Sequence, residues 1–356
     1  MNQQRLQKVL DNMKQAGLHQ LLVTETEPVY YLTGIWVSPM ERMMALYIRE
    51  DGKVTFFGNK LFAIAPQEGL EMVEHTDSDD PVAQLAAAVL PGELGIDETW
   101  PSRFLIGLMS HRPDVKPVLG SEPVAQATMY KDEEERKLMR AASRIDDACI
   151  DMAIHAIREG ITEKELSSKV EHFFQEKGCD HLGFSIVAMG ANGADPHHGT
   201  DGTVLKEGDS IVMDIGAPFN HYWCDMTRTV FYKSASEEQR TVYETVRRAN
   251  EAAIAVVKPG VAFKEIDLAA RKVIEDAGYG EYFTHRTGHS IGMKEHEQPP
   301  VSSECEVIAK PGMIFSIEPG IYLPGKFGVR VEDLVLVTED GCEVLNKYPK
   351  DLIVVE

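Results

Sequence analysis

Apolar positions in the first part of the chain follow two different periods. Residues 2–16 and 81–90 show helical spacing, whereas the short apolar runs around them have the length of strands. These runs lie at residues 21–24, 43–48, 54–57 and 94–96. Helices and strands in alternation predict an α/β layer domain.

The pattern changes after residue 112. Residues 112–124 contain three prolines and a glycine, which is typical of a linker. We therefore expect a first domain over residues 1–124 and a second over residues 125–356. A long helix is predicted to begin near Lys131, where acidic residues follow in the positions that a helix N-terminus favours. Short strands and two further helices, 237–257 and 263–277, predict an α+β second domain.

Composition limits the partners and the location. A chain of 356 residues, 43% hydrophobic and 26% charged, can bury the cores of two domains. The net charge of −21 argues against nucleic acid or an anionic membrane as partner. No apolar run approaches the ~20 residues that span a bilayer. The N-terminus has no signal-peptide core and the five cysteines are scattered, so we expect a cytoplasmic protein.

One short passage occurs twice, at Lys206–Gly216 and at Lys310–Gly320. Each copy is a Lys-x-Gly turn, a short apolar strand and a carboxylate that is followed two residues later by glycine. A second carboxylate follows each copy on the next strand-like run. The four carboxylates are Asp214, Asp225, Glu318 and Glu332. A buried carboxylate is costly unless it is paired or bound to metal, so the repeat indicates a cation site.

Hairpins would bring these carboxylates together. A turn near residues 218–220 would place Asp214 and Asp225 almost opposite each other, and a longer turn at 322–328 would do the same for the second pair. Between the two copies lies a glycine-rich stretch, in which the backbone can approach the site and His289 can supply a nitrogen ligand.

The charges predict a pair of metal ions. Two divalent cations would balance the four carboxylates, and an oxygen-rich set with one imidazole suits Mn²⁺, Co²⁺, Zn²⁺ or Fe²⁺. We expect Mn²⁺ first. Two such ions roughly 3.5–4 Å apart can bridge a water, lower its pKa and polarise a carbonyl, which is hydrolytic chemistry.

These residues and their flanks resemble the pita-bread metallopeptidases, the superfamily of methionine aminopeptidase, aminopeptidase P and prolidase. The strings that resemble its proline-specific branch are Cys224–Thr229, His285–Gly292, Ile317–Tyr322, Val329–Asp333, Tyr31–Gly34 and Glu41–Leu46. The resemblance covers the whole chain. It implies a creatinase-like α/β N-terminal domain before a pita-bread catalytic domain, in which the repeated passage corresponds to an internal pseudo-twofold duplication.

The resemblance also implies a role for each matching residue. The metals would be held by Asp214, Asp225, His289, Glu318 and Glu332, with Asp225 and Glu332 bridging. Glu318 would act as general acid and base, and His296 would stabilise the tetrahedral intermediate.

Further residues match positions around the substrate. His197 matches the substrate-binding histidine of the family, whereas His198 does not, and a solvated loop would also account for either histidine. His285 and Arg330 match positions that line the pocket of the proline-specific branch. The charged Arg286 could reach the carboxylate of the peptide.

Within this family the residues favour an Xaa-Pro dipeptidase (prolidase) that hydrolyses the bond before proline. The alternative is an Xaa-Pro aminopeptidase (aminopeptidase P), which acts on longer peptides. The compact length and Arg286 favour the dipeptidase. The loop at residues 34–42 carries Ser38 and Met40 where some similar dipeptidases have Asp and His, and this departure leaves size selection open.

Two other classes remain. A non-catalytic pita-bread binding protein would have lost metal ligands, but all five are present here. A methionine aminopeptidase usually lacks an N-terminal domain of this size. The resemblance further implies a homodimer.

Overall fold

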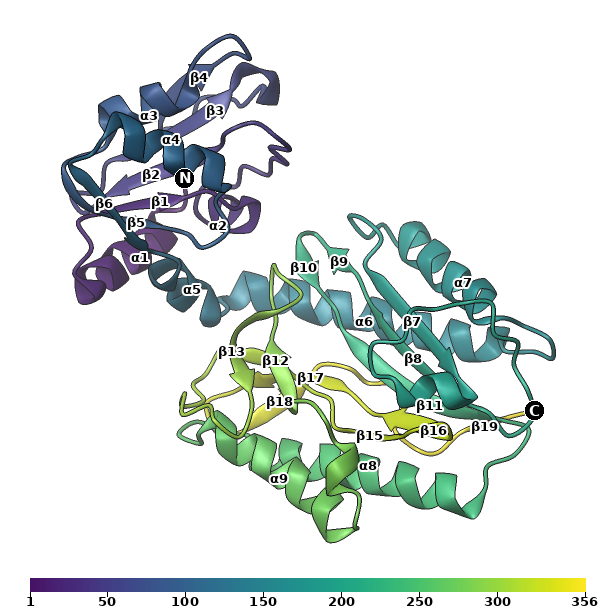
Figure 1. Cartoon of the computed structure of the whole chain (residues 1–356). Coiled ribbons are helices and arrows are strands. Elements are labelled where there is room, and N and C mark those ends of the chain that lie inside the picture. Colours follow the sequence, from purple (N-terminus) through teal and green to yellow (C-terminus); the bar gives the residue numbers. More distant parts are fainter. The chain divides into compact units, whose positions relative to one another are not determined.

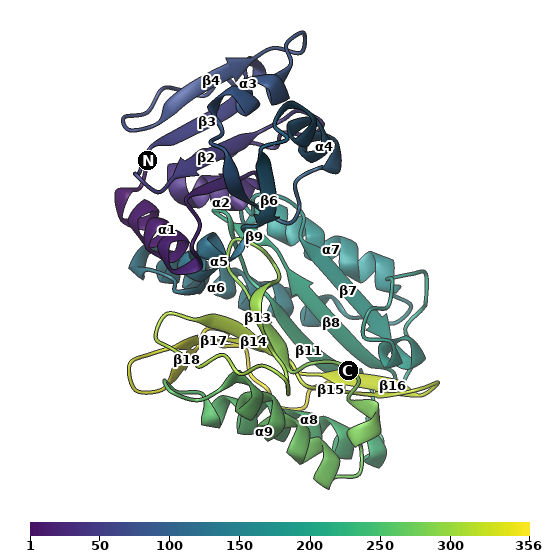
Figure 2. The same ribbon diagram turned by 60° about the vertical axis from the view of Figure 1, so that its left-hand side comes forward.

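Two parts of the chain fold as separate units, Met1–Thr128 and Met129–Glu356. The structure is a computed structural model that describes residues 1–356. Figure 1 shows its elements, and Figure 2 shows them from a second direction. The first unit extends to residue 128, beyond the boundary at residue 124 that the sequence indicated.

The first unit is built on one six-stranded sheet in the order β4-β3-β2-β1-β5-β6. Its strands are β1 (Gln20–Val23), β2 (Ala45–Arg49), β3 (Val54–Asn59), β4 (Glu71–His75), β5 (Gly92–Ile96) and β6 (Val115–Leu119). Its helices are α1 (Gln3–Ala16), α2 (Thr26–Thr33), α3 (Pro81–Ala88), α4 (Ser102–His111) and α5 (Glu122–Met129), with a short 3₁₀ turn at Lys60–Phe62. The α/β layer domain predicted from the sequence is confirmed.

The linker predicted over residues 112–124 is wrong. These residues form β6 and the start of α5. β6 is an edge strand of the sheet, so one of its sides has no neighbouring strand. Proline is tolerated in edge strands because it cannot donate a hydrogen bond to a neighbouring strand. Pro123 lies in the first turn of α5, where its missing N–H has no intrahelical partner to lose. Prolines that suggested a linker are thus tolerated by the edge of a sheet and the start of a helix.

The second unit combines four helices with short sheets. Its helices are α6 (Glu133–Ala156), α7 (Glu163–Glu176), α8 (Glu237–Val256) and α9 (Phe263–Asp276), with 3₁₀ turns at Gly190–Ala194 and Gly280–Tyr282. Its strands begin with β7 (Phe184–Met189), β8 (Ser210–Gly216), β9 (Pro218–Phe219), β10 (Tyr222–Trp223) and β11 (Met226–Tyr232). They continue with β12 (Gly288–Ser290), β13 (Glu297–Val301), β14 (Ile314–Ile317), β15 (Gly320–Leu323), β16 (Phe327–Arg330), β17 (Asp333–Val337), β18 (Cys342–Val344) and β19 (Val354–Val355).

The same order of elements occurs twice in this unit. Helices α6 and α7 precede β7, β8 and β11, which lie in a four-stranded sheet ordered β19-β11-β8-β7. Helices α8 and α9 precede β12, β14 and β17, which lie in a five-stranded sheet ordered β13-β12-β14-β17-β18. In Figures 1 and 2, α8 and α9 run side by side along one side of the strands. The predicted α+β domain, with its three long helices, is confirmed.

In the second unit, apolar side chains of the helices and strands form two cores. One packs α6 and α7 on β7, β8 and β11, and the other packs α8 and α9 on β14 to β17. Each of the two larger sheets of the second unit is thereby packed against a pair of helices. No helix combines the length and the apolar character needed to cross a membrane.

Candidate metal centre

Strands β8 and β11 present the first two carboxylates on one face. They pair antiparallel with Asp214 opposite Thr227, so Asp225, two residues before Thr227, faces the same side one diagonal step away. The expected turn near residues 218–220 is the hairpin β9–β10, where Asn220 and His221 have φ of 49° and 69°. The two aspartates are therefore neighbours on one face, although not directly opposite each other.

Strands β14 and β17 present the second pair. Ile317 is paired with Asp333, and Glu318 and Glu332 are the residues directly after β14 and directly before β17. The longer turn expected at residues 322–328 is the hairpin β15–β16. The second pair of carboxylates is thus brought together by strand pairing, as the sequence indicated.

His289 reaches the site because β12 lies very close to β14. A Cβ atom on Gly288 would be 2.0 Å from the backbone oxygen of Ser316, so only glycine fits there. The His289 N–H donates to Ser316 Oγ at 3.0 Å, and that hydroxyl donates to Glu318 Oε1 at 3.1 Å. Ser316 therefore links the histidine to the carboxylate.

All ten residues that the sequence singled out line one cavity of about 460 Å³. They are His197, Asp214, Asp225, His285, Arg286, His289, His296, Glu318, Arg330 and Glu332. Sequence reasoning missed the other lining residues, Phe184, Ile186, Pro196 and Glu295. Of these, Glu295 stands directly before His296, and Phe184 and Ile186 are two residues apart on β7, so they face the same side of the strand. These two positions are the only signals in the sequence that could have identified them.

Three side chains already converge as metal ligands do. Ligand atoms of Asp225, His289 and Glu332 all lie within 4.8 Å of one another. His289 Nε2 is 3.5 Å from Asp225 Oδ2 and 3.5 Å from Glu318 Oε1. Asp225, His289 and Glu332 are almost completely buried. A cation placed among them would have oxygen and imidazole ligands on several sides.

The pKa values and hydrogen bonds of these carboxyls also indicate a cation site. Burial, and then the nearby charges of other carboxylates, raise the pKa values of Asp225 and Glu332 well above the ordinary range. Asp214 Oδ1 and Glu332 Oε1 are buried and have no hydrogen-bond partner. Unpartnered buried carboxylate oxygens are rare unless an ion takes the place of a donor. The donor set therefore fits divalent metal ions.

Arg330 supplies fixed positive charge beside this acid cluster. Its Nη2 donates to Asp214 Oδ2 at 2.6 Å and its Nη1 to the Tyr322 hydroxyl at 3.0 Å. Its Nε donates to Thr227 Oγ1 at 2.9 Å, and this hydroxyl donates to Glu332 Oε2 at 2.7 Å. With only 3% of its side chain exposed, Arg330 orients one carboxylate directly and a second through Thr227.

Glu318 differs from the other acids in its pKa. Burial would raise the pKa of this carboxyl, but His289, His285 and Arg330 together hold it below its ordinary value. Glu318 is therefore an ionised carboxylate at neutral pH, and it can accept a proton.

Two of the cavity histidines are neutral at neutral pH. Burial, and then the nearby charges of His289 and Arg286, lower the pKa of His296 to about 4. Burial is also the main cause that lowers the pKa of His285, whose Nε2 lies 2.8 Å from the Tyr322 hydroxyl. Because burial raises the pKa of Tyr322 to about 12, the phenol keeps its proton. A neutral imidazole can donate or accept a hydrogen bond at such a site.

The histidine pair at residues 197 and 198 splits into two roles. His197 is exposed and lines the cavity. His198 is turned away into the protein, where its Nε2 lies 2.8 Å from Glu163 Oε2. A solvated loop does not describe His198, because its side chain is only 13% exposed.

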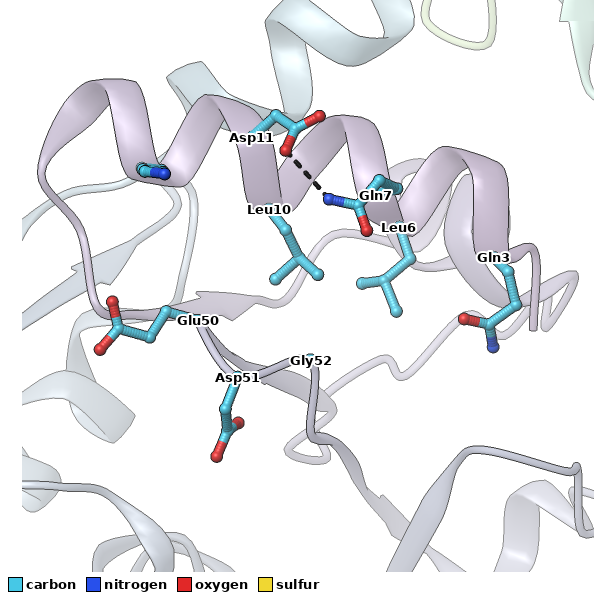
Figure 3. Close-up of a pocket in the computed structure, with 9 residues that line it drawn as sticks. Gln3, Leu6, Gln7, Leu10, Asp11, Glu50, Asp51 and Gly52 are labelled. Atoms are coloured by element: carbon cyan, nitrogen blue, oxygen red, sulfur yellow. Dashed lines mark hydrogen bonds between the residues drawn. The ribbon is translucent and has the colours of Figure 1, made fainter.

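A second cavity, of about 500 Å³, lies in the first unit between α1 and the turn after β2. Leu6 and Leu10 point from α1 toward the turn at Glu50–Gly52, and Gln7 donates to Asp11 at 2.9 Å (Figure 3). No histidine, cysteine or buried acid lines it, so it offers no comparable chemistry.

The fold and this acid-rich centre define a metallopeptidase. Residues 137–339 match metallopeptidase family M24, and residues 5–128 match the creatinase/prolidase N-terminal domain. The chain belongs to metallopeptidase family M24. The pita-bread fold and the two-domain organisation implied by the sequence resemblance are confirmed.

Several relatives are similar over nearly their whole length. The putative dipeptidase YkvY of Bacillus subtilis is 35% identical, with 98% of this chain and 99% of that protein covered. A dipeptidase from Pyrococcus horikoshii OT3 has a TM-score of 0.94 at 35% identity, with 98% and 99% covered. The prolidase of Thermococcus sibiricus has a TM-score of 0.94 at 34% identity, with 99% of each chain covered. An X-Pro aminopeptidase from Thermotoga maritima gives 0.83 at 29%, with 97% and 100% covered.

Glu332→Gln should stabilise the protein when no metal is bound. Folding raises the pKa of Glu332 above its value in the unfolded chain. The folded protein therefore loses stability as the pH rises above the unfolded-state pKa, and a glutamate at this position is unfavourable at pH 7. We expect the free energy of unfolding to rise by about 1 kcal/mol or more in chelator. With Mn²⁺ added, the wild type should be more stable than Glu332→Gln, because the wild type binds Mn²⁺ more tightly.

Urea unfolding with and without chelator measures both effects. Glu339→Gln, at an exposed position outside the cavity, is the matched control and should change neither value. A Glu332→Gln protein that is less stable than the wild type in chelator would contradict this account of the charges.

Proposed function

We propose that this metallopeptidase is an Xaa-Pro dipeptidase that uses two divalent metal ions. The observation that carries the proposal is the gathering of all ten residues in one cavity. The relatives named as dipeptidases and prolidases support the same reaction class.

The proposed ligands are Asp214, Asp225, His289, Glu318 and Glu332, with Asp225 and Glu332 shared between the ions. Bound divalent ions would polarise the scissile carbonyl and lower the pKa of a water molecule. Mn²⁺ is the proposed metal, and Co²⁺, Zn²⁺ and Fe²⁺ suit the same ligands.

The proton transfers are assigned to Glu318. Because it is ionised at neutral pH, this carboxylate can take the proton of the attacking water and then pass it to the leaving proline nitrogen. His296, which is neutral at neutral pH, can donate an N–H hydrogen bond to the oxygen that becomes negative in the transition state. His296 lies next to His289, with ring centroids 3.9 Å apart, and is thus beside the metal site.

The substrate is proposed to lie between His197, His285 and Arg330 on one side and Arg286 at the rim. Arg330 is buried and donates to three side chains, so it shapes the wall. Arg286 is exposed, its guanidinium makes no hydrogen bond or ion pair, and it is the other cation that lines the cavity. A free C-terminal carboxylate of an Xaa-Pro dipeptide would find its partner there.

An Xaa-Pro aminopeptidase is the second candidate. Ser38 and Met40, and the similarity to the X-Pro aminopeptidase of Thermotoga maritima, favour it. A homodimer in the cytoplasm completes the proposal, and the five unpaired cysteines support a reducing compartment. The peptide is the proposed partner, with no nucleic acid or membrane.

The direct test compares an Xaa-Pro dipeptide with an Xaa-Pro-Yaa tripeptide under Mn²⁺. We expect faster release of proline from the dipeptide, measured as kcat/KM. Glu318→Gln should lower kcat by roughly 10²–10⁴ because the general base is lost, whereas the exposed Glu281→Gln should not. Comparable cleavage of the tripeptide would establish the aminopeptidase, and no cleavage of either peptide would refute both candidates.

Arg286→Met should discriminate between substrates with and without a free carboxylate. We expect KM for the dipeptide to rise about tenfold, since a charged hydrogen bond contributes roughly 1.5–3 kcal/mol when made. KM for the same dipeptide as its C-terminal amide should hardly change. Arg248→Met, at an exposed position on α8, is the control. Equal effects on the acid and the amide would remove Arg286 from carboxylate recognition.

A further inference from the structure

We propose that Glu163, acting with His198, is a positioning residue that holds the loop carrying His197 in place at the cavity. The kinetic part of this inference rests on the proposed function, in which His197 contacts the substrate. The loop consists of residues 189–201 and lies in the second unit, as does α7, from which Glu163 comes.

Glu163 binds both ends of the loop with one carboxylate. It is the first residue of α7 and is completely buried. Its Oε1 accepts the N–H of Met189 at 2.7 Å and the side-chain amide of Asn192 at 3.0 Å. Its Oε2 accepts the N–H of Asp201 at 3.0 Å and a hydrogen bond from His198 Nε2 at 2.8 Å. The two ends and the middle of the loop are therefore tied to a single buried group.

Because the Glu163 carboxylate already accepts four hydrogen bonds, it does not need a metal ion to be satisfied. Glu163, His198 and Asp201 place ligand atoms within 4.8 Å of one another, which is a spacing that a metal could use. Both oxygens of Glu163 are already engaged by N–H groups, however, and a buried carboxylate that accepts four hydrogen bonds is satisfied. The arrangement is a clamp made of hydrogen bonds.

His197 depends on this clamp because its own imidazole makes no hydrogen bond. Its place in the cavity is set by the backbone, where its N–H donates to Asp195 Oδ1 at 3.0 Å and the His198 N–H donates to the Asp195 oxygen at 3.2 Å. Directly before His197, the Pro196 oxygen accepts a hydrogen bond from Arg330 Nη1 at 3.4 Å. The loop thus connects Glu163 on α7 with the arginine beside the metal ligands.

A double-mutant cycle tests the positioning role. His198→Gln should lower kcat/KM for an Xaa-Pro dipeptide about tenfold, as expected for the loss of a charged hydrogen bond. In a His197→Ala background the same change should cost less than about twofold, because the residue that it positions is gone. His172→Gln is the matched control, since His172 on α7 pairs with Glu176 at the exposed surface. Equal losses in both backgrounds, or no loss in the wild type, would overturn the inference.

Hydrogen–deuterium exchange tests the clamp without any turnover. His198→Gln should speed exchange in residues 189–201 while the melting temperature and the rest of α7 stay as in the wild type and in His172→Gln. Unchanged exchange in this segment would refute the clamp. Failure of the wild type to cleave any Xaa-Pro peptide would refute the proposed function alone, and the exchange result would still decide this inference.

Discussion

Repulsion among buried carboxylates is the constraint on which the second unit depends. Asp225 and Glu332 are almost fully buried within one cavity, where burial and the charges of Asp214 and Glu318 raise the pKa values of both. Such groups cannot all ionise together unless positive charge lies among them. The protein supplies one fixed cation, Arg330, and leaves carboxylate oxygens of Asp214 and Glu332 unpartnered. The remaining charge is best supplied by divalent ions, and this need links the fold to peptide hydrolysis.

The scaffold holds this unfavourable cluster by backbone pairing and by small residues. Strands β8–β11 and β14–β17 fix the carboxylates through their register, and Gly288 allows β12 to approach β14 closely enough to deliver His289. The helices anchor the opposite side of the sheets through two apolar cores. The walls of the cavity are not fixed by strand pairing throughout, because His197 and His296 lie on loops. The hydrogen bonds of Glu163 hold the loop of His197 in place, as strand pairing holds the proposed metal ligands in place.

Much of the centre could be predicted because its residues are repeated and spaced by strand geometry. The two Lys-x-Gly passages placed Asp214 and Glu318, and the strands that follow placed their partners. The sequence could not show Glu163, since a glutamate in a first helical turn resembles any N-terminal acid until the fold brings the loop to it. The linker failed for a related reason, because Pro117 and Pro123 gain their meaning from an edge strand and a helix start that only tertiary structure defines.

The most direct test of the central claim is the number of divalent ions that the purified chain binds. Calorimetric titration of the chelated protein with Mn²⁺, repeated in buffers of different ionisation enthalpy, measures both the ions bound and the protons released. The account predicts two ions per chain, with proton release as the raised pKa values of Asp225 and Glu332 fall on binding. Fewer than one ion per chain, or binding without proton release, would contradict it.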